Sequence, residues 1–270
     1  MKSTIQLSIL LFLGFQLAVY TQETEETEQY EPVYIAMTTT HWSDDPDTDF
    51  SGWLDTEKEY FEKVASKNDL ILSSGVFTHY FTPDNSEVVL VNVYRTWNDI
   101  EEANSRTEEL IAEGWKDDES RKKFFEKQQS YYSAEHRDEI YQSMQFSIPE
   151  TVDKENPKIY YVRTADLSMN GEGTPENFKQ YYENITKKSK KLKGYYTHRH
   201  LWGSNAREMN EVFVFDKLGD IEEFFEEEQG LVNSHWADED ERSELMEEMT
   251  KLFTGKHGDY VYRNVPSLMK

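Results

Sequence analysis

Two short segments of the chain alternate histidine with aromatic residues, and they hold the side chains best suited to chemistry. The first contains Phe77, His79 and Phe81, and the second contains His198, His200 and Trp202. An alternation of two residues places each set on one face of a strand. Imidazole can shuttle protons near neutral pH and can ligate haem iron. The aromatic rings around it favour a flat, apolar ligand.

Each half of the chain contributes a second set of candidates, made of one tryptophan, one histidine and one tyrosine. These are Trp115, His136 and Tyr141 in the first half, and Trp236, His257 and Tyr262 in the second. If the histidine-bearing strand faces look at helices, these side chains could complete two similar ligand pockets. The alternative interpretation is structural, because paired tryptophans often anchor a core and the two later histidines could hydrogen-bond across a loop.

The candidates recur because the chain contains an internal repeat. The segment that begins at His79 matches the segment that begins at His200, an offset of 200 − 79 = 121, and 16 of the 64 pairs from His79 to Gln142 are identical. The first strand of each copy matches at 157 − 32 = 125 instead. A repeat of this kind indicates two copies of one structural unit.

Each copy is expected to fold in the order β-α-β-β-α-β, from alternation, helix caps and turn residues. The expected elements of the first copy are strands over 33–40, 75–81, 88–94 and 139–146, and helices over 54–67 and from 98, interrupted near 115. Those of the second are strands over 159–165, 195–202, 211–215 and 260–265, and helices over 175–191 and from 219, interrupted near 236.

This order is that of the ferredoxin-like split βαβ unit, and two such units in tandem resemble the dimeric α/β-barrel superfamily. That superfamily includes cofactor-independent antibiotic-biosynthesis-type monooxygenases, chlorite-dismutase-like haem proteins and stress-responsive barrel proteins. The resemblance covers nearly all of the chain after the N-terminal segment, and no family-specific catalytic motif accompanies it. It implies an α+β fold in which two sheets face each other within one chain, with helices outside and pockets between each sheet and its own helices.

The N-terminus predicts export. A basic start, an apolar stretch over 5–17 and small residues after it are typical of a signal peptide. The expected organisation is a signal peptide over 1–21, a disordered acidic lead-in over 22–31, a first unit over 32–148, a linker over 149–156 and a second unit over 157–270. The location would then be periplasmic or extracellular.

Composition excludes several classes of function. The net charge of −24 opposes binding to nucleic acid or to an anionic membrane surface, and the chain contains no cysteine for thiolate chemistry, disulfides or cysteine-ligated metals. The acidic loop over 44–49 begins like a calcium loop, but Phe50 and Thr56 stand where that motif needs Gly and Glu. No metal site is therefore predicted.

The function favoured by the sequence is a binding protein that holds an apolar or aromatic small molecule between sheet and helices. Alternatives are a cofactor-independent monooxygenase-like enzyme with His79 or His200 as proton shuttle, a haem protein, and a purely structural or interaction protein. No cofactor is predicted, and the expected state is a monomer with an internal pseudo-dimer. The second pocket is expected to matter more, because it has His198 where the first copy has Phe77.

Overall fold

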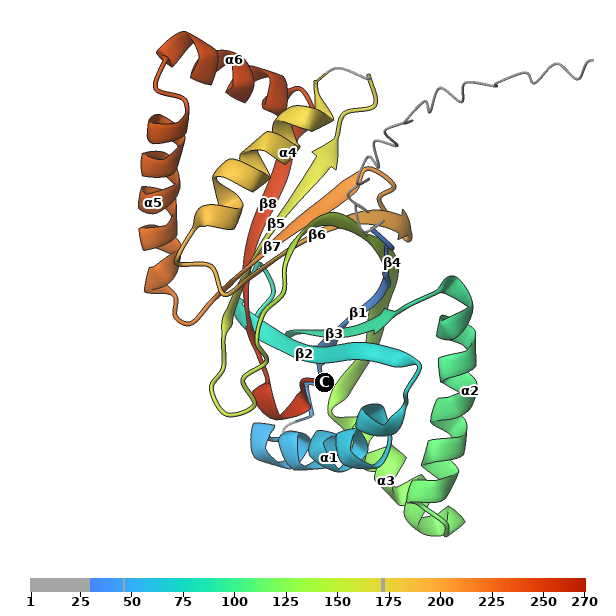
Figure 1. Ribbon diagram of the computed structural model, residues 1–270. Helices are drawn as coiled ribbons and strands as arrows, with labels where there is room; N and C mark the ends of the chain where they lie inside the picture. Colours follow the sequence, from blue (N-terminus) through green and yellow to red (C-terminus); the bar gives the residue numbers. More distant parts are fainter. Residues whose placement is uncertain (1–29, 46, 171–172) are drawn as a thin grey trace, which may run out of the picture. The chain divides into compact units, whose positions relative to one another are not determined.

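The computed structural model describes residues 30–45, 47–170 and 173–270 (Figure 1). Contacts within the chain separate residues 1–31 from a compact unit over Pro32–Lys270, and the description below concerns that unit. The predicted signal peptide and most of the acidic lead-in lie outside the described residues. The boundaries expected for the signal peptide, units and linker stay predictions.

The first repeat forms four strands and three helices in the expected order. They are β1 (Tyr34–Trp42), α1 (Phe50–Lys63), β2 (Ile71–Phe81), β3 (Glu87–Tyr94), α2 (Trp97–Gly114), α3 (Asp118–Ser130) and β4 (Tyr132–Ile148), with a short 3₁₀ turn over Ala65–Lys67. Two side-chain caps explain where α2 and α3 begin. Thr96 accepts a hydrogen bond from the Asp99 N–H in a capping box, and Asp117 accepts one from the Ser120 N–H.

The second repeat has the same order of elements. They are β5 (Ile159–Leu167), α4 (Pro175–Asn184), β6 (Gly194–Trp202), β7 (Glu208–Phe215), α5 (Gly219–His235), α6 (Glu239–Thr250) and β8 (Phe253–Asn264), with 3₁₀ turns over Thr186–Lys188 and Pro266–Leu268. The first helix of each repeat ends earlier than the sequence predicted, at Lys63 and Asn184. The cause is the same in both repeats: the next residue, Val64 or Ile185, is buried and the chain tightens into a 3₁₀ turn there.

All eight strands join in one closed antiparallel barrel, in the order β1-β3-β2-β8-β5-β7-β6-β4. Each repeat supplies four neighbouring strands in the ferredoxin-like order. The two repeats meet at two seams, where β2 pairs with β8 and β4 pairs with β6. The structure thus confirms the expected α+β fold, a tandem duplication that forms the dimeric α/β barrel within one chain.

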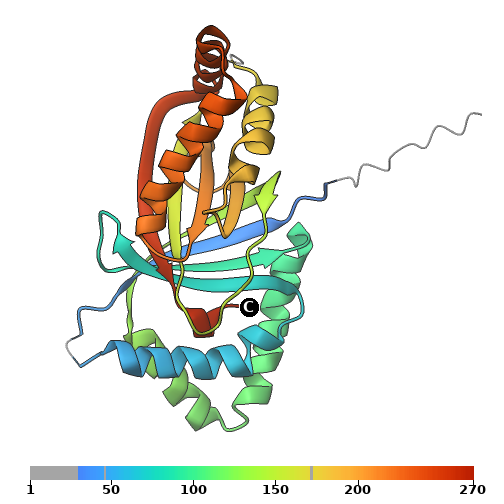
Figure 2. The same ribbon diagram turned by 60° about the vertical axis from the view of Figure 1, so that its left-hand side comes forward.

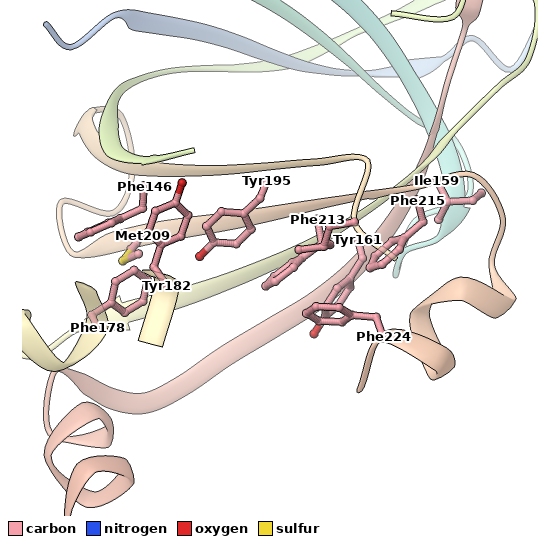
Figure 3. Packing of buried hydrophobic residues seen from close by; sticks show 11 residues of the cluster. Phe146, Ile159, Tyr161, Phe178, Tyr182, Tyr195, Met209, Phe213, Phe215 and Phe224 are labelled. Atoms are coloured by element: carbon pink, nitrogen blue, oxygen red, sulfur yellow. The ribbon is translucent and has the colours of Figure 1, made fainter. Parts of the chain in front are cut away.

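The helices of each repeat cover the outer face of that repeat's strands. Figures 1 and 2 show α1 to α3 on one side of the strands and α4 to α6 on the other. The largest core cluster lies in the second repeat, where aromatic residues of the sheet pack against α4 and α5. Figure 3 shows Phe146, Phe178 and Tyr182 at one end of this cluster and Phe213, Phe215 and Phe224 at the other.

Candidate functional site

The histidine-bearing face of the second strand in each repeat points into the barrel and away from the helices. On β2, Val76 packs in the cluster around Trp53 of α1, so the alternate residues Phe77 and His79 face the barrel interior. On β6, the ring of Tyr195 packs against α4, which likewise turns His198 and His200 inward. The condition for two histidine-containing pockets beneath the helices is therefore not met.

Inside the barrel, each histidine meets a tyrosine of the other repeat across a seam. His79 pairs with Tyr262 in the β2–β8 register, and His200 pairs with Tyr141 in the β6–β4 register. A glutamate completes each row, because the Tyr262 hydroxyl lies 3.1 Å from Glu87 Oε2 and the Tyr141 hydroxyl lies 2.6 Å from Glu208 Oε1. Glu87 and Glu208 are also related by the repeat, since 208 − 87 = 121.

The inward-facing histidines differ in their surroundings. His79 Nδ1 lies 2.8 Å from the Thr82 hydroxyl. The side chain of His200 is 1% exposed, and neither of its ring nitrogens has a hydrogen-bond partner in the described part of the chain. Burial lowers the pKa of His198 to about 4, so this imidazole is neutral at neutral pH. His79 and His200 thus lie at the two seams, on strands that pair with the other repeat.

Four other candidates lie among the helices or at exposed positions. Trp115 packs among helices α2 and α3, with Lys63 Nζ 4.3 Å from its ring centroid. His136 is exposed and its Nε2 lies 3.3 Å from Asp138 Oδ2. Phe81 and Trp202, at the ends of β2 and β6, are 58% and 69% exposed.

A cavity that the sequence did not reveal lies between α5 and the outer face of β5 and β8. Its volume is about 790 Å³, and it is open to solvent. Tyr161 and Val261 line it from the sheet, and Ile221 and Phe225 line it from α5. These side chains give the cavity an apolar wall of the kind that small-molecule sites use.

A polar network borders this wall on the outer face of the sheet. The Tyr161 hydroxyl donates to Asp259 Oδ1 at 2.6 Å, and Arg163 Nη2 donates to the same hydroxyl at 2.9 Å. His257, one of the sequence candidates, joins through its Nε2, which lies 3.4 Å from Asp259 Oδ2. Burial is the largest cause of the raised pKa of Tyr161, so the phenol keeps its proton and acts as a hydrogen-bond donor.

Two carboxyl groups near Arg163 extend the network towards α4 and α5. The Tyr195 hydroxyl donates to Glu211 Oε1 at 2.6 Å, and Glu228 forms a hydrogen bond with Tyr181. Burial raises the pKa of both glutamates, and the positive charge of Arg163 opposes that rise. Another sequence candidate lies at this end, because the ring of Trp236 stacks on that of Tyr181 with centroids 6.3 Å apart.

The first repeat keeps only a small part of this network, in which His136 Nε2 lies 3.3 Å from Asp138 Oδ2 and the Thr38 hydroxyl donates to Asp138 Oδ1. The repeat pairs Tyr161, Arg163, Glu211 and Glu228 with Ala36, Thr38, Leu90 and Thr107. Ala36 instead packs in an apolar cluster with Ile71, Tyr94 and Ala103. A comparison of the two copies for charged residues opposite small or apolar ones could have found this site, whereas a search for shared residues could not.

The residues around this cavity do not suit a metal ion or a histidine-bound haem. No group of three or more His, Asp or Glu side chains in the described ranges is placed to hold a metal ion. None of the residues that line the cavity is a histidine, and the nearby His257 is exposed and paired with Asp259. The cavity therefore lacks the axial ligand that a histidine-bound haem needs. No helix in the described ranges is long and apolar enough to cross a membrane.

Comparisons with known proteins support the fold and nothing finer. No family model matches the chain, and no curated protein matches its sequence. A monooxygenase-like protein from Fusobacterium nucleatum aligns with 88% of this chain and 94% of its own at 10% identity, with a TM-score of 0.55. A second such protein, from Lactobacillus acidophilus, aligns with 89% of this chain and 96% of its own at 10% identity, with a TM-score of 0.51.

A chlorite dismutase from Candidatus Nitrospira defluvii also aligns, over 87% of this chain and 92% of its own, at 11% identity and a TM-score of 0.49. At such identities the similarity concerns the arrangement of strands and helices alone. One fold of this kind hosts unrelated functions, so the site itself must carry the functional argument.

Proposed function

We propose that the protein binds an apolar or aromatic small molecule in the cavity between α5 and the outer face of β5 and β8. The observation that carries the proposal is the cavity of about 790 Å³, whose apolar wall borders a polar network with a tyrosine and an arginine that the first repeat lacks. This volume is within the range typical of small-molecule sites. The apolar body of the ligand would lie against Val261 and Phe225, and its polar atoms would face the Tyr161 and Arg163 side.

Binding is favoured over catalysis on the sheet side of the cavity, where the Tyr161 phenol is not prepared to remove a proton. Tyr161 retains its proton, and the neighbouring carboxyl group of Asp259 already accepts its hydrogen bond. We also propose that the mature chain acts outside the cytoplasm after removal of residues 1–21, and that it acts as a monomer. N-terminal sequencing of the exported protein would test the first point.

The test measures a neutral aromatic probe, 2-(1-naphthyl)ethanol, by isothermal titration calorimetry. We expect one binding site per chain. Phe225→Ala should weaken binding about tenfold, because the probe loses apolar contact area. The matched control is Asn104→Ala, at the position of α2 that the repeat pairs with Phe225 (225 − 121 = 104). Equal affinities of Phe225→Ala and the unmodified protein, or no binding at all, would contradict the proposal.

A further inference from the structure

We infer that the ligand of this cavity is an organic cation, an amine carried on an apolar or aromatic body. The inference rests on the proposed function and adds the charge of the ligand. It comes from two charged residues among those that line the cavity, which differ in kind from its apolar residues.

Two glutamates of α5, Glu222 and Glu226, line the cavity beside its apolar wall. They stand four residues apart and so lie on the same side of the helix. Like charges at this spacing destabilise a helix. Neither carboxylate has a hydrogen bond or an ion pair within the part of the chain that the structure describes, and both residues are exposed.

Three cationic side chains of this repeat, Arg163, Lys191 and Lys217, are already paired with other residues. Arg163 contacts Tyr161 and Asp259 on the sheet. Lys217, which precedes α5, lies 3.6 Å from Asp220, and Lys191 pairs with Glu223. No lysine, arginine or histidine is among the residues that line the cavity. The negative charges of Glu222 and Glu226 therefore remain available to a ligand.

The aromatic residues of the cavity suit the same chemistry. Tyr161 and Phe225 both line it, and their rings meet nearly at right angles, with centroids 6.0 Å apart. An ammonium group is attracted to the face of an aromatic ring, and the attraction grows as water is excluded. An amine can thus contact the rings and the carboxylates together, while its apolar body lies against Ile221 and Val261.

An anionic ligand should bind this cavity more weakly than a cation. A carboxylate would lie beside Glu222 and Glu226 and be repelled by both, and the chain as a whole carries a net charge of −24. Two exposed carboxylates at a few ångströms give a difference on the order of tenfold in affinity between a cation and a neutral analogue. Salt should reduce that difference, because exposed charges are screened.

The experiment compares three probes that share one naphthalene body, by isothermal titration calorimetry at neutral pH. They are 2-(1-naphthyl)ethylamine, 2-(1-naphthyl)ethanol and 1-naphthaleneacetate. We expect the amine to bind about tenfold more tightly than the alcohol at low salt, and the carboxylate to bind most weakly. At about 0.5 M NaCl the affinities of the amine and the alcohol should become similar, because the screening length falls to about 4 Å.

A pair of double variants separates local charge from net charge. The double variant Glu222→Gln with Glu226→Gln should lower the affinity for the amine to that for the alcohol. The affinity for the alcohol should not change. The control is Glu101→Gln with Glu108→Gln on α2, which removes the same charge from exposed glutamates of the first repeat. The control should keep the tenfold preference for the amine.

The outcomes distinguish this inference from the proposed function. If all three probes bind equally and Phe225→Ala weakens all of them, the small-molecule site stands and its preference for cations is wrong. A carboxylate that binds most tightly, or an amine preference that both double variants lose equally, also overturns the inference. If none of the probes binds, both the inference and the proposed function fail.

Discussion

The residue pair His198 and Phe77 shows how a single side chain makes one repeat differ from the other. The two occupy the same position, since 198 − 121 = 77, and both face the barrel interior. Phe77 packs its ring against Tyr160 across a seam, with centroids 4.7 Å apart. The Nδ1 atom of His198 is buried without a hydrogen-bond partner in the described residues. Burial disfavours the protonated form of such an imidazole, because its charge would be removed from water.

His198 should therefore make the fold sensitive to acid. In the unfolded chain its imidazole is protonated below its ordinary pKa of 6.5, whereas in the folded chain it stays neutral down to about 4. The folded state binds fewer protons in that window, so stability falls as the pH drops from 6.5 to 4, by at most about 3 kcal/mol. His198→Phe should remove this loss, as measured by urea unfolding at several pH values.

An exposed histidine supplies the control for that measurement. His257→Gln changes a side chain that is 57% exposed, so it should leave the acid sensitivity of the fold in place. An unchanged pH profile in His198→Phe would show that the acid sensitivity arises elsewhere.

At the scale of elements, the sequence predicted which segments form strands and helices but not which face of a strand meets which layer. Alternation separates Phe77 and His79 from Val76, yet both faces of β2 contain apolar residues, so the pattern could not say which face meets the helices. The helix ends at Lys63 and Asn184 were missed because a tight 3₁₀ turn continues the helical spacing of apolar residues.

The candidate site shows a second limit of the same kind. Tyr161 and Arg163 were assigned correctly to a strand, but their hydrogen bonds to Asp259 depend on the pairing of β5 with β8. That pairing joins segments almost a hundred residues apart, and nothing local to either segment fixes its register. The repeat predicted the barrel because duplication is visible in the sequence, whereas the tyrosine, arginine and glutamates of the network occur in one copy alone.

Two glycines differ in whether their position can accept a side chain. Gly203, in the turn between β6 and β7, has φ = +134°, and an added Cβ would come within 2.7 Å of Glu139 Cγ and 2.8 Å of His200 Nε2. Gly203→Ala should therefore destabilise the fold by about 1–3 kcal/mol. Gly230, within α5, has open space around it, so Gly230→Ala should stabilise the fold by up to about 1 kcal/mol. Thermal unfolding of both variants measures the contrast, and effects of the same sign would contradict this account.

At the scale of the whole compact unit, the two repeats exchange their chain ends. Phe146, near the end of β4, packs in the aromatic cluster of the second repeat. Val265 and Leu268, after β8, pack beside Trp53 of α1 in the first repeat. The C-terminal turn, drawn in red, lies beside α1 in Figure 1. The last segment of each repeat thus covers core residues of the other.

This exchange predicts how each half behaves alone. A half that spans residues 32–153 leaves the pairing edges of β2 and β4 without partners and uncovers Trp53, which is fully buried in the intact chain. Unpaired strand edges and uncovered apolar surface favour association. The seams suit a second copy of the same half, because both repeats place a histidine on the second strand and a tyrosine on the fourth. His79 of one copy can then face Tyr141 of the other, as it faces Tyr262 in the intact chain.

We therefore expect the half over 32–153 to form a two-fold dimer that rebuilds the barrel, and the full mature chain to remain a monomer. Sedimentation equilibrium of both proteins at several concentrations measures this directly. The dimer of this half should dissociate only when it unfolds, because neither copy can cover its own Trp53.

Leu268→Ala in the full chain provides a matched measurement of the same contact. It removes apolar packing beside Trp53 and should lower the free energy of unfolding by about 2–4 kcal/mol. A half that is a stable, well-folded monomer would show that the exchanged ends and the seams do not hold the barrel together.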